Sequence, residues 1–283
     1  MAKIGLVLEG GGMRGLYTAG VLDLFLEKEL VVDYVIGVSA GACNGVSYVS
    51  GQYERSKRVN INYINDGEYV SFKNFLKKGS MFNMDFLFDK IPSELEPFDY
   101  EAFANSPIEM IIGVTNIDTG LPVYFGKDKT KNDSTVARAS SAIPIFSNIV
   151  NYEGGKYLDG GTIDPIPFQK AFRDGCDKCI VVTTQQRGYM KKPYGKAVQA
   201  IIRRYFKKYP NMADTVINRW KIYNVQVEKI SKLELEGKAL IITPVNPLEV
   251  DRFERKESKL EALYFQGKKD AADMYDKILE FMK

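Results

Sequence analysis

Residues 33–41 read D-Y-V-I-G-V-S-A-G, and the last five of them contain the spacing Gly37-x-Ser39-x-Gly41. This spacing is typical of a sharp turn from a strand into a helix, with an exposed serine at the tip. The apolar residues before the turn suit a buried strand, and the small residues at 42–49 suit a closely packed helix. The stretch therefore predicts a strand, a turn that presents Ser39, and a helix.

The same order of elements occurs once before it. Residues 3–8 are rich in Ile, Leu and Val, as in a strand that is covered on both faces. Glycines at 10–12 end this run, and residues 15–29 carry apolar side chains at helical spacing. Strand, helix, strand and helix within about fifty residues indicate parallel α/β architecture. We expect an α/β fold in which helices flank a mostly parallel central sheet in α/β/α layers.

Three regions follow from the rest of the pattern. Residues 52–107 are rich in aromatic side chains and loop formers, which predicts short helices and loops. They form either a cap insertion over the site or an ordinary packed insertion. The alternation of strands and helices continues to residue 185, which predicts one domain over 1–185. We expect a mainly helical C-terminal extension with one strand over 186–283, in which the helix at 254–281 is interrupted near Gly267.

Composition limits the classes of protein that need considering. The chain has 283 residues, of which 45% are hydrophobic and 27% charged, values typical of a soluble globular protein. No uncharged apolar stretch reaches the roughly 18 residues of a membrane-spanning helix, and the apolar run at 3–8 is too short for a signal peptide. We expect a cytoplasmic protein, with peripheral membrane contact as an open alternative.

The three cysteines do not indicate a disulfide framework, which agrees with a reducing compartment. Cys176 and Cys179 have the spacing of a zinc knuckle, but the chain has no histidine and only one other cysteine, Cys43. A four-ligand structural site of the usual kind is therefore not expected, and no metal is predicted. We interpret the pair as two buried thiols at the start of a strand.

Charge is distributed unevenly, although the net charge of +3 is too small to indicate a partner by itself. No acidic residue lies between Asp177 and Asp214, and residues 197–209 have an amphipathic helical pattern. The basic residues inside this stretch include Arg187, Lys191, Lys192, Lys196, Arg203, Arg204, Lys207 and Lys208. A solvated helix packed on the core and a transient contact with an anionic membrane surface both explain the pattern. Nucleic-acid binding is not expected, because no motif for it is present.

A nucleophilic serine needs a base within hydrogen-bond reach, and the chain contains no histidine. Lysine and aspartate remain as possible bases. The best candidate is Asp159, which follows a hairpin arm and precedes Gly160 and Gly161, whose flexibility permits a sharp turn at a sheet edge. Its pKa, ordinarily near 3.9, would have to rise through burial. The alternative interpretation is that Asp159 and Gly160 simply form an ordinary turn.

A glycine-rich loop, E-G-G-G-M-R-G at residues 9–15, lies between the first strand and the first helix. Backbone amides at such a helix start can donate hydrogen bonds to an oxyanion. The spacing Gly10-x-Gly12-x-x-Gly15 also matches the dinucleotide fingerprint, which calls for an acidic residue at the end of the second strand. The turn at Ser39 occupies that position instead. The combination favours acyl chemistry, and dinucleotide binding stays as an alternative.

Taken together, G-G-G-M-R-G at 10–15, G-V-S-A-G at 37–41 and D-G-G at 159–161 resemble the three motifs of the patatin-like phospholipase family, in the family's order. The stretch A-S-S-A-I-P at 139–144 is similar to a segment that precedes the family's aspartate. The resemblance covers about residues 4 to 185, the predicted catalytic domain.

The resemblance implies a serine acyl-ester hydrolase of the phospholipase or lysophospholipase type, acting on an acyl-ester lipid without metal or organic cofactor. By motif position, Ser39 is the nucleophile and Asp159 the general base of a Ser-Asp dyad. The amides of Gly10, Gly11 and Gly12 form the oxyanion hole, and Arg14 supports it or binds an anionic head group. The motif-supporting residues are Gly15, Gly37, Gly41, Gly160 and Gly161. A noncatalytic lipid-binding or regulatory protein is the alternative, and the pattern indicates nothing about oligomeric state.

Overall fold

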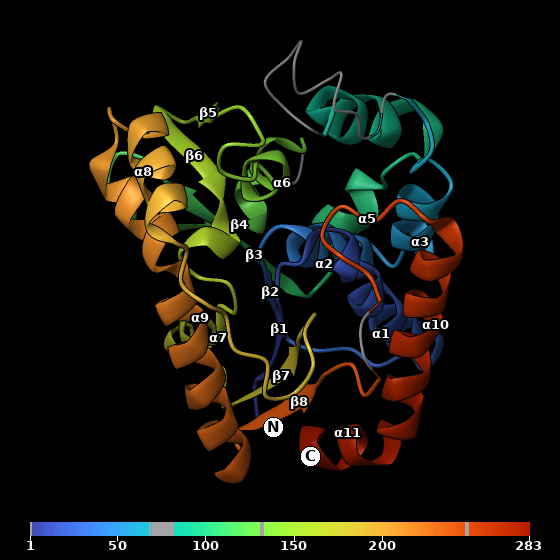
Figure 1. Ribbon diagram of the computed structural model, residues 1–283. Coiled ribbons are helices and arrows are strands. Elements are labelled where there is room, and N and C mark those ends of the chain that lie inside the picture. The colour runs from blue at the N-terminus through green and yellow to red at the C-terminus, as the bar shows by residue number, and fades with distance from the viewer. Residues whose placement is uncertain (1, 68, 70–81, 131–132, 247–248) are drawn as a thin grey trace.

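The computed structural model describes residues 2–67, 69, 82–130, 133–246 and 249–283 (Figure 1). Its centre is an eight-stranded sheet, in which hydrogen-bonded neighbours run β5-β6-β3-β2-β1-β7-β8 and β4 pairs with β3. The parallel strands are β3 (Glu109–Asn116), β2 (Tyr34–Gly37), β1 (Ile4–Leu8), β7 (Lys178–Val182) and β8 (Ala239–Ile242). The antiparallel strands are β4 (Pro122–Gly126), β5 (Val150–Tyr152) and β6 (Gly155–Asp159).

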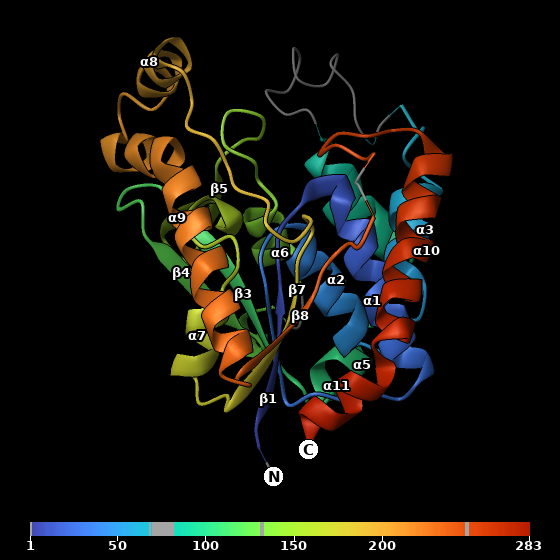
Figure 2. The same ribbon diagram turned by 60° about the horizontal axis from the view of Figure 1, so that its bottom comes forward.

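Helices cover both faces of this sheet (Figure 2). One face carries α1 (Gly15–Glu27), α2 (Ala40–Val49) and α10 (Glu257–Asp273), and the other carries α7 (Phe168–Arg173) and α9 (Pro210–Leu235). Successive side chains of β1 point to opposite faces of the sheet, because side chains alternate along a strand. Leu6 and Leu8 pack into the cluster that contains α1, whereas Val7 packs into the cluster that contains α7 and α9. The expected mostly parallel α/β/α fold is confirmed.

Short helices make up the region predicted as a cap or packed insertion. They are α3 (Arg55–Ile61), the π-helical segment η2 (Phe86–Leu95) and α5 (Tyr100–Asn105). Residues 68 and 70–81 of the predicted insertion lie outside the described residues. The remaining helices and helical turns are η1 (Gly12–Arg14), η3 (Lys127–Lys129), α6 (Thr135–Ser140), η4 (Gly160–Thr162), α8 (Lys196–Tyr205) and α11 (Tyr275–Met282).

The C-terminal region joins the same sheet, since β8 pairs with β7 in parallel and α10 lies along α1. The expected helix interruption near Gly267 is wrong. Gly267 lies inside α10, and the break occurs at Met274, between α10 and α11. This glycine allows a close approach between helices, because a side chain there would overlap the main-chain oxygen of Tyr17 on α1. The proposed division of the chain near residue 185 stays a prediction.

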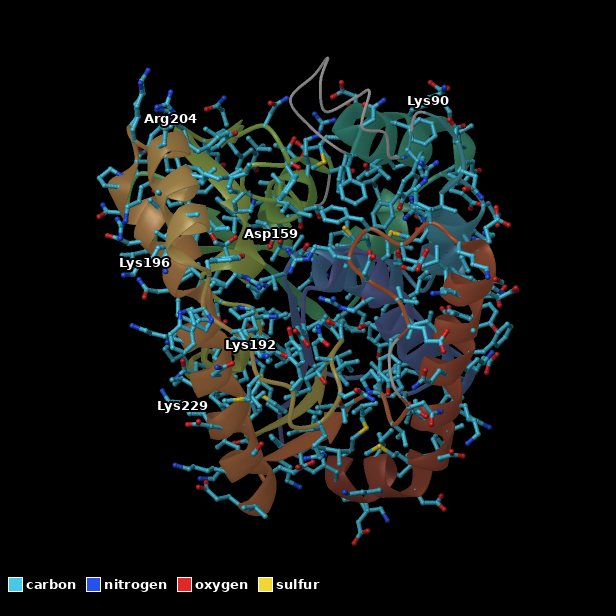
Figure 3. The ribbon with its side chains drawn as sticks, in the orientation of Figure 1. Lys90, Asp159, Lys192, Lys196, Arg204 and Lys229 are labelled. Carbon is cyan, nitrogen blue, oxygen red and sulfur yellow. The ribbon has the colours of Figure 1, made fainter. Side chains whose placement is uncertain are left out.

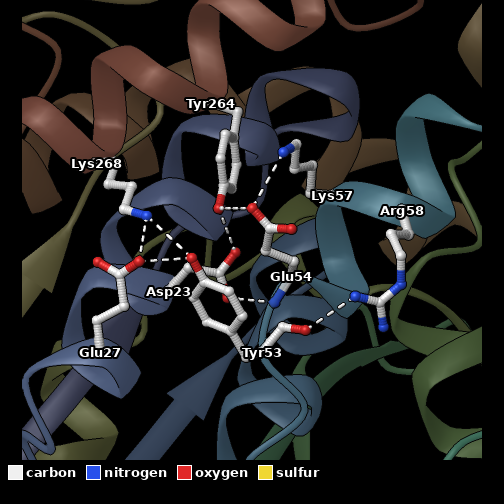
Figure 4. Close-up of polar contacts among 8 residues, drawn as sticks. All are labelled: Asp23, Glu27, Tyr53, Glu54, Lys57, Arg58, Tyr264 and Lys268. Carbon is white, nitrogen blue, oxygen red and sulfur yellow. Dashed lines mark hydrogen bonds and ion pairs between the residues drawn. The ribbon is translucent and has the colours of Figure 1, made fainter.

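A buried polar network also ties α10 to the N-terminal helices (Figure 4). Asp23 of α1 accepts hydrogen bonds from the hydroxyl of Tyr264 on α10, at 2.9 Å, and from the amide of Glu54, at 3.0 Å. Burial raises the pKa of Asp23 to about 6. An ion pair between Glu27 and Lys268 joins the same two helices nearer the surface. These contacts hold the C-terminal helix α10 against the N-terminal helix α1 on one face of the sheet.

Candidate active site

Ser39 stands at the turn between β2 and α2, as the sequence predicted. Its backbone has φ 54° and ψ −129°, a conformation that costs free energy in a residue with a side chain. Gly37 and Gly41 permit this turn, because a Cβ atom at Gly37 would lie 2.6 Å from the main chain of Gly41. The amide of Ser39 donates to the hydroxyl of Ser140 at 2.8 Å, and that hydroxyl donates to the carbonyl of Gly113 at 2.6 Å. The strained turn is therefore held by hydrogen bonds to β3 and α6.

Strand pairing explains how Asp159 comes to Ser39. Ile111 of β3 pairs with both β2 and β4, so these two strands lie on opposite edges of β3. Val114 pairs with both β4 and Asp159 of β6, so β6 lies on the same edge as β2. Since β2 ends at Gly37, β6 occupies the edge that β2 leaves free. Asp159 therefore meets the chain where it turns at Ser39.

Asp159 is 8% exposed, and its carboxylate lies within interaction range of the Ser39 side chain. The carboxylate accepts a hydrogen bond from the amide of Gly161 at 2.7 Å. Burial raises the pKa of Asp159 above its ordinary value, while the Ser39 side chain and the charges of Arg219 and Arg252 oppose the rise. The site thus keeps an acceptor beside the serine and makes it more basic than an exposed aspartate.

The glycine loop lies directly beside the serine. A Cβ atom at Gly10 would come within 3.0 Å of the Cβ atom of Ser39. Gly12 has φ 58°, the left-handed region that favours glycine, and the side chain and carbonyl of Arg252 pack against it. Within the described ranges, no acceptor takes a hydrogen bond from the amides of Gly10, Gly11 or Gly12. These three amides are free to bind an incoming oxygen atom.

Two cavities meet at the serine, and Gly12, Ser39 and Ile143 line both of them. The first, which we call the aromatic cavity, is mainly apolar, and its aromatic lining includes Tyr69, Phe82, Phe88, Phe98, Tyr100 and Phe103. The second, which we call the basic cavity, has a volume of about 350 Å³ and contains Asp159, Arg219 and Arg252 as its charged lining residues. Val198 and Ile201 of α8 form part of its wall. The aromatic insertion therefore does reach the candidate site.

The remaining motif residues lie around this centre. Gly15 begins α1 against Ala40, and Gly160 and Gly161 follow Asp159 in η4. Arg14 lies within electrostatic reach of Glu9 and Arg252, and it lines neither cavity. The structure therefore brings Ser39, Asp159 and the three loop glycines together but leaves the Arg14 side chain outside the two cavities.

The sequence interpretation gave no role to three residues that the structure places at the site. Ser140 holds the amide of Ser39, and the only sequence signal for it was the A-S-S-A-I-P stretch. Arg219 donates from Nε to the carbonyl of Gly161 at 2.6 Å, next to Asp159. The carbonyl of Arg252 accepts from the amide of Met13 at 3.2 Å, which places this arginine over the glycine loop. Both arginines belong to the C-terminal region, where no chemical pattern marked them.

Cys176 and Cys179 are buried free thiols at the start of β7, as interpreted. In the part of the chain that the structure describes, no three cysteine or acidic side chains gather as metal ligands. Each helix of that part is also too short or too polar to cross a membrane.

Fold and site together define an α/β protein with a serine on a strand-to-helix elbow beside a buried aspartate. The chain belongs to the patatin-like phospholipase family, whose model matches residues 6–172. A second family model, described as a domain of unknown function, matches residues 209–283. The family membership that the three motifs led us to expect is confirmed.

Two sequence relatives and one solved structure are similar to the chain. The uncharacterized protein YjjU of Escherichia coli is 35% identical over 187 residues, covering 64% of this chain and 52% of YjjU. Lysophospholipase NTE1 of Meyerozyma guilliermondii is 24% identical over 265 residues, which cover 88% of this chain and 16% of that protein. VipD from Legionella pneumophila has a similar fold, with a TM-score of 0.54 and 14% identity, over 98% of this chain and 67% of that chain. The chain therefore spans about half or less of these two sequence relatives.

Proposed function

We propose that the protein is a serine acyl-ester hydrolase of the phospholipase or lysophospholipase type. Ser39 is the nucleophile and Asp159 the general base. The observation that carries the proposal is that Ser39 and the buried carboxylate of Asp159 line the same cavity, within interaction range of each other, in a chain without histidine. Membership in the patatin-like phospholipase family supports a lipid ester as the substrate class.

The proposed cycle has two halves. Asp159 takes the proton of the Ser39 hydroxyl while the serine oxygen attacks the ester carbonyl, and the amides of Gly10, Gly11 and Gly12 bind the oxyanion. Losing one such donor typically costs about 3 to 4 kcal/mol of transition-state stabilisation. Asp159 returns the proton to the leaving alcohol as the acyl–oxygen bond breaks. In the second half, Asp159 takes a proton from water, which attacks the acyl-enzyme, and then returns that proton to Ser39.

The aromatic cavity suits the acyl chain of the substrate. It opens at Ser39 and is lined mainly by apolar side chains from the insertion, so a hydrocarbon chain that enters it leaves water. The ester carbonyl then lies between Ser39 and the glycine loop. A noncatalytic lipid-binding protein would have no need for free amides at this point.

Labelling with a fluorophosphonate tests the proposed nucleophile. We expect the folded protein to be modified at Ser39, identified by peptide mass spectrometry, because the probe reacts with activated serines. Heat-denatured protein and Ser39→Ala should remain unlabelled, whereas Ser258→Ala, which removes an exposed serine of α10, should label fully. Absence of label at Ser39 in well-folded protein would contradict the proposal and favour the noncatalytic alternative.

We further propose that α8 contacts an anionic membrane surface. Ile202 and Phe206 are buried against α9, while Val198, Ile201 and Tyr205 are 43%, 62% and 53% exposed. Basic residues, including Arg203 and Arg204, accompany this apolar surface. A helix that offers apolar and basic side chains together can bind the interface of an anionic bilayer. Its position on the wall of the basic cavity would bring lipid close to the site.

Vesicle flotation checks this contact. We expect binding to phosphatidylserine vesicles that weakens roughly tenfold in Ile201→Ser, because one fewer large apolar side chain is buried. Val225→Ser is the matched control, since Val225 is 47% exposed on α9. Equal binding to neutral and anionic vesicles, or no effect of Ile201→Ser, would contradict the proposed surface.

A further inference from the structure

A buried arginine lies in the wall of the aromatic cavity, although that cavity is mainly apolar. Arg55 begins α3 and is 8% exposed. The central carbon of its guanidinium group lies 5.1 Å from the centre of the Phe98 ring, and Phe98 lines the same cavity. The charged end of the side chain, and not only its stem, therefore belongs to the cavity wall.

Most of the hydrogen-bonding capacity of Arg55 is unused. A guanidinium group carries five N–H donors, and Nη2 of Arg55 donates to the carbonyl of Glu96 at 2.9 Å. The Nε–H group is buried and has no partner among the residues that the structure describes. The carboxylate of Glu96 forms its ion pair with Arg58 instead, at 3.0 Å. Burial lowers the pKa of Arg55, because the charge is held away from water.

Other polar groups in the same wall already have partners. The hydroxyl of Tyr69, for example, donates to the side-chain oxygen of Asn60 at 2.8 Å. In the described part of the chain, buried side-chain atoms without a partner also occur in Arg14 and Thr18, but neither residue lines the aromatic cavity. Leaving a buried charged donor unpaired costs free energy. Arg55 is therefore the group whose donors a ligand in this cavity would satisfy.

This guanidinium group lies along the cavity from the reacting serine and not beside it. Cys43 follows Ser39 by one turn of α2, and its amide donates to the Ser39 carbonyl at 3.1 Å. Cys43 is within electrostatic reach of both Asp159 and Arg55, and α3 packs against α2 (Figure 1). One helical turn rises about 5.4 Å. A ligand atom bound by Arg55 would thus be several bonds away from an ester at Ser39.

We propose that Arg55 binds an oxygen atom carried by the acyl chain, so that the cavity selects oxygenated acyl esters over esters with a plain hydrocarbon chain. The inference rests on the proposed function and adds a specificity for the acyl part of the substrate. A plain chain would fill the cavity but leave the guanidinium donors unpaired. A hydroxyl or carboxylate on the chain accepts hydrogen bonds from them, and such bonds are stronger when one partner is charged.

Matched p-nitrophenyl esters of one chain length test this assignment, using the full chain below the critical micelle concentration. One ester has a plain chain, and the others carry a mid-chain hydroxyl, a terminal hydroxyl or a terminal carboxylate. We expect the wild type to have a kcat/KM at least about tenfold higher for one or more oxygenated esters than for the plain ester. Arg55→Met, which removes the donors and keeps an apolar side chain, should lower this ratio to about one, and Arg55→Lys should retain part of it.

The ratio separates recognition from a structural role of Arg55. Two kcat/KM values measured on one sample share the same folded fraction, so loss of folded protein lowers both and leaves their ratio unchanged. Lys90→Met is the matched control, because Lys90 is an exposed cation on the outer side of η2, away from Asp159 (Figure 3). Its ratio should stay within roughly twofold of the wild type.

An unchanged ratio in Arg55→Met would overturn the inference. A wild type that cleaves all of the esters equally well, or prefers the plain one, would overturn it without any variant. Fastest cleavage of the carboxylated ester would assign the site to an anionic chain end, and fastest cleavage of a hydroxylated ester to a neutral one, and both outcomes support binding of oxygen by Arg55. A wild type that cleaves none of the esters would instead count against the proposed function, so the two failures are distinguishable.

Discussion

Replacing Ser39 by alanine should abolish hydrolysis of lipid esters, lowering kcat by roughly 10⁴-fold or more. The variant has no oxygen to form the acyl-enzyme, while the amides of the glycine loop remain. Folding should be preserved, because the hydrogen bond that holds the turn runs from the amide of Ser39 to Ser140 and not from its hydroxyl. Kinetics with a purified lysophospholipid, together with circular dichroism, check the result. Turnover retained at the wild-type rate would end the Ser-Asp mechanism.

Replacing Asp159 by asparagine should lower kcat about as much as Ser39→Ala does, because the two side chains act as a unit. Asp159→Asn keeps the shape of the side chain and can still accept a hydrogen bond from the amide of Gly161. It cannot take the proton of Ser39. Asp276→Asn, an exposed aspartate of α11, is the control and should leave kcat within twofold.

The pH dependence follows from the same carboxylate. Asp159 works as a base only when ionised, and burial raises its pKa above the ordinary value. Activity should therefore be lost as the pH falls through this raised pKa, at a higher pH than the value near 3.9 of an exposed aspartate. A profile of kcat/KM against pH that stays flat down to the ordinary value would contradict the assignment.

Local patterns in the sequence predicted those parts of the site that are built from neighbours along the chain. The glycine spacing around Ser39 predicted the elbow, because that turn depends on contacts within five residues. The alternation of strands and helices likewise predicted the layers, since periodicity reflects burial on each face. Asp159 was found by its Asp-Gly-Gly motif and family resemblance, but the reason it meets Ser39 lies in the strand pairing around β3.

The site residues that come from the C-terminal region were not predicted. Arg219 and Arg252 enter the basic cavity from α9 and from the segment before α10, and a single arginine in a charged stretch carries no pattern. The position of the helix break was missed for a related reason. A glycine inside a helical pattern usually weakens the helix, but Gly267 is needed for a contact with α1 that no local window contains.

That contact gives Gly267→Ala a large expected effect on stability. A Cβ atom at Gly267 would lie closer than 3.0 Å to the carbonyl oxygen and the carbonyl carbon of Tyr17, a separation that real Cβ atoms essentially never show. The obstacle is backbone, so no rotamer change can relieve it and the helices must separate. Overpacking of this kind typically costs about 1 to 3 kcal/mol or more, and the gain of about 1 kcal/mol in helix propensity offsets only part of it.

We therefore expect thermal unfolding of Gly267→Ala to occur several degrees below the wild type, with a net loss of about 2 kcal/mol. Glu261→Ala, at an exposed position of the same helix, should change the free energy of unfolding by less than about 0.5 kcal/mol. Gly20 faces Tyr264 in the reciprocal position, so the double variant Gly20→Ala with Gly267→Ala should cost less than the sum of the two, because one separation of α1 from α10 relieves both. Strict additivity, or unchanged stability of Gly267→Ala, would mean that α10 is not held by this contact. The polar network at Asp23 and Tyr264 would then be what docks the C-terminal helix onto the sheet.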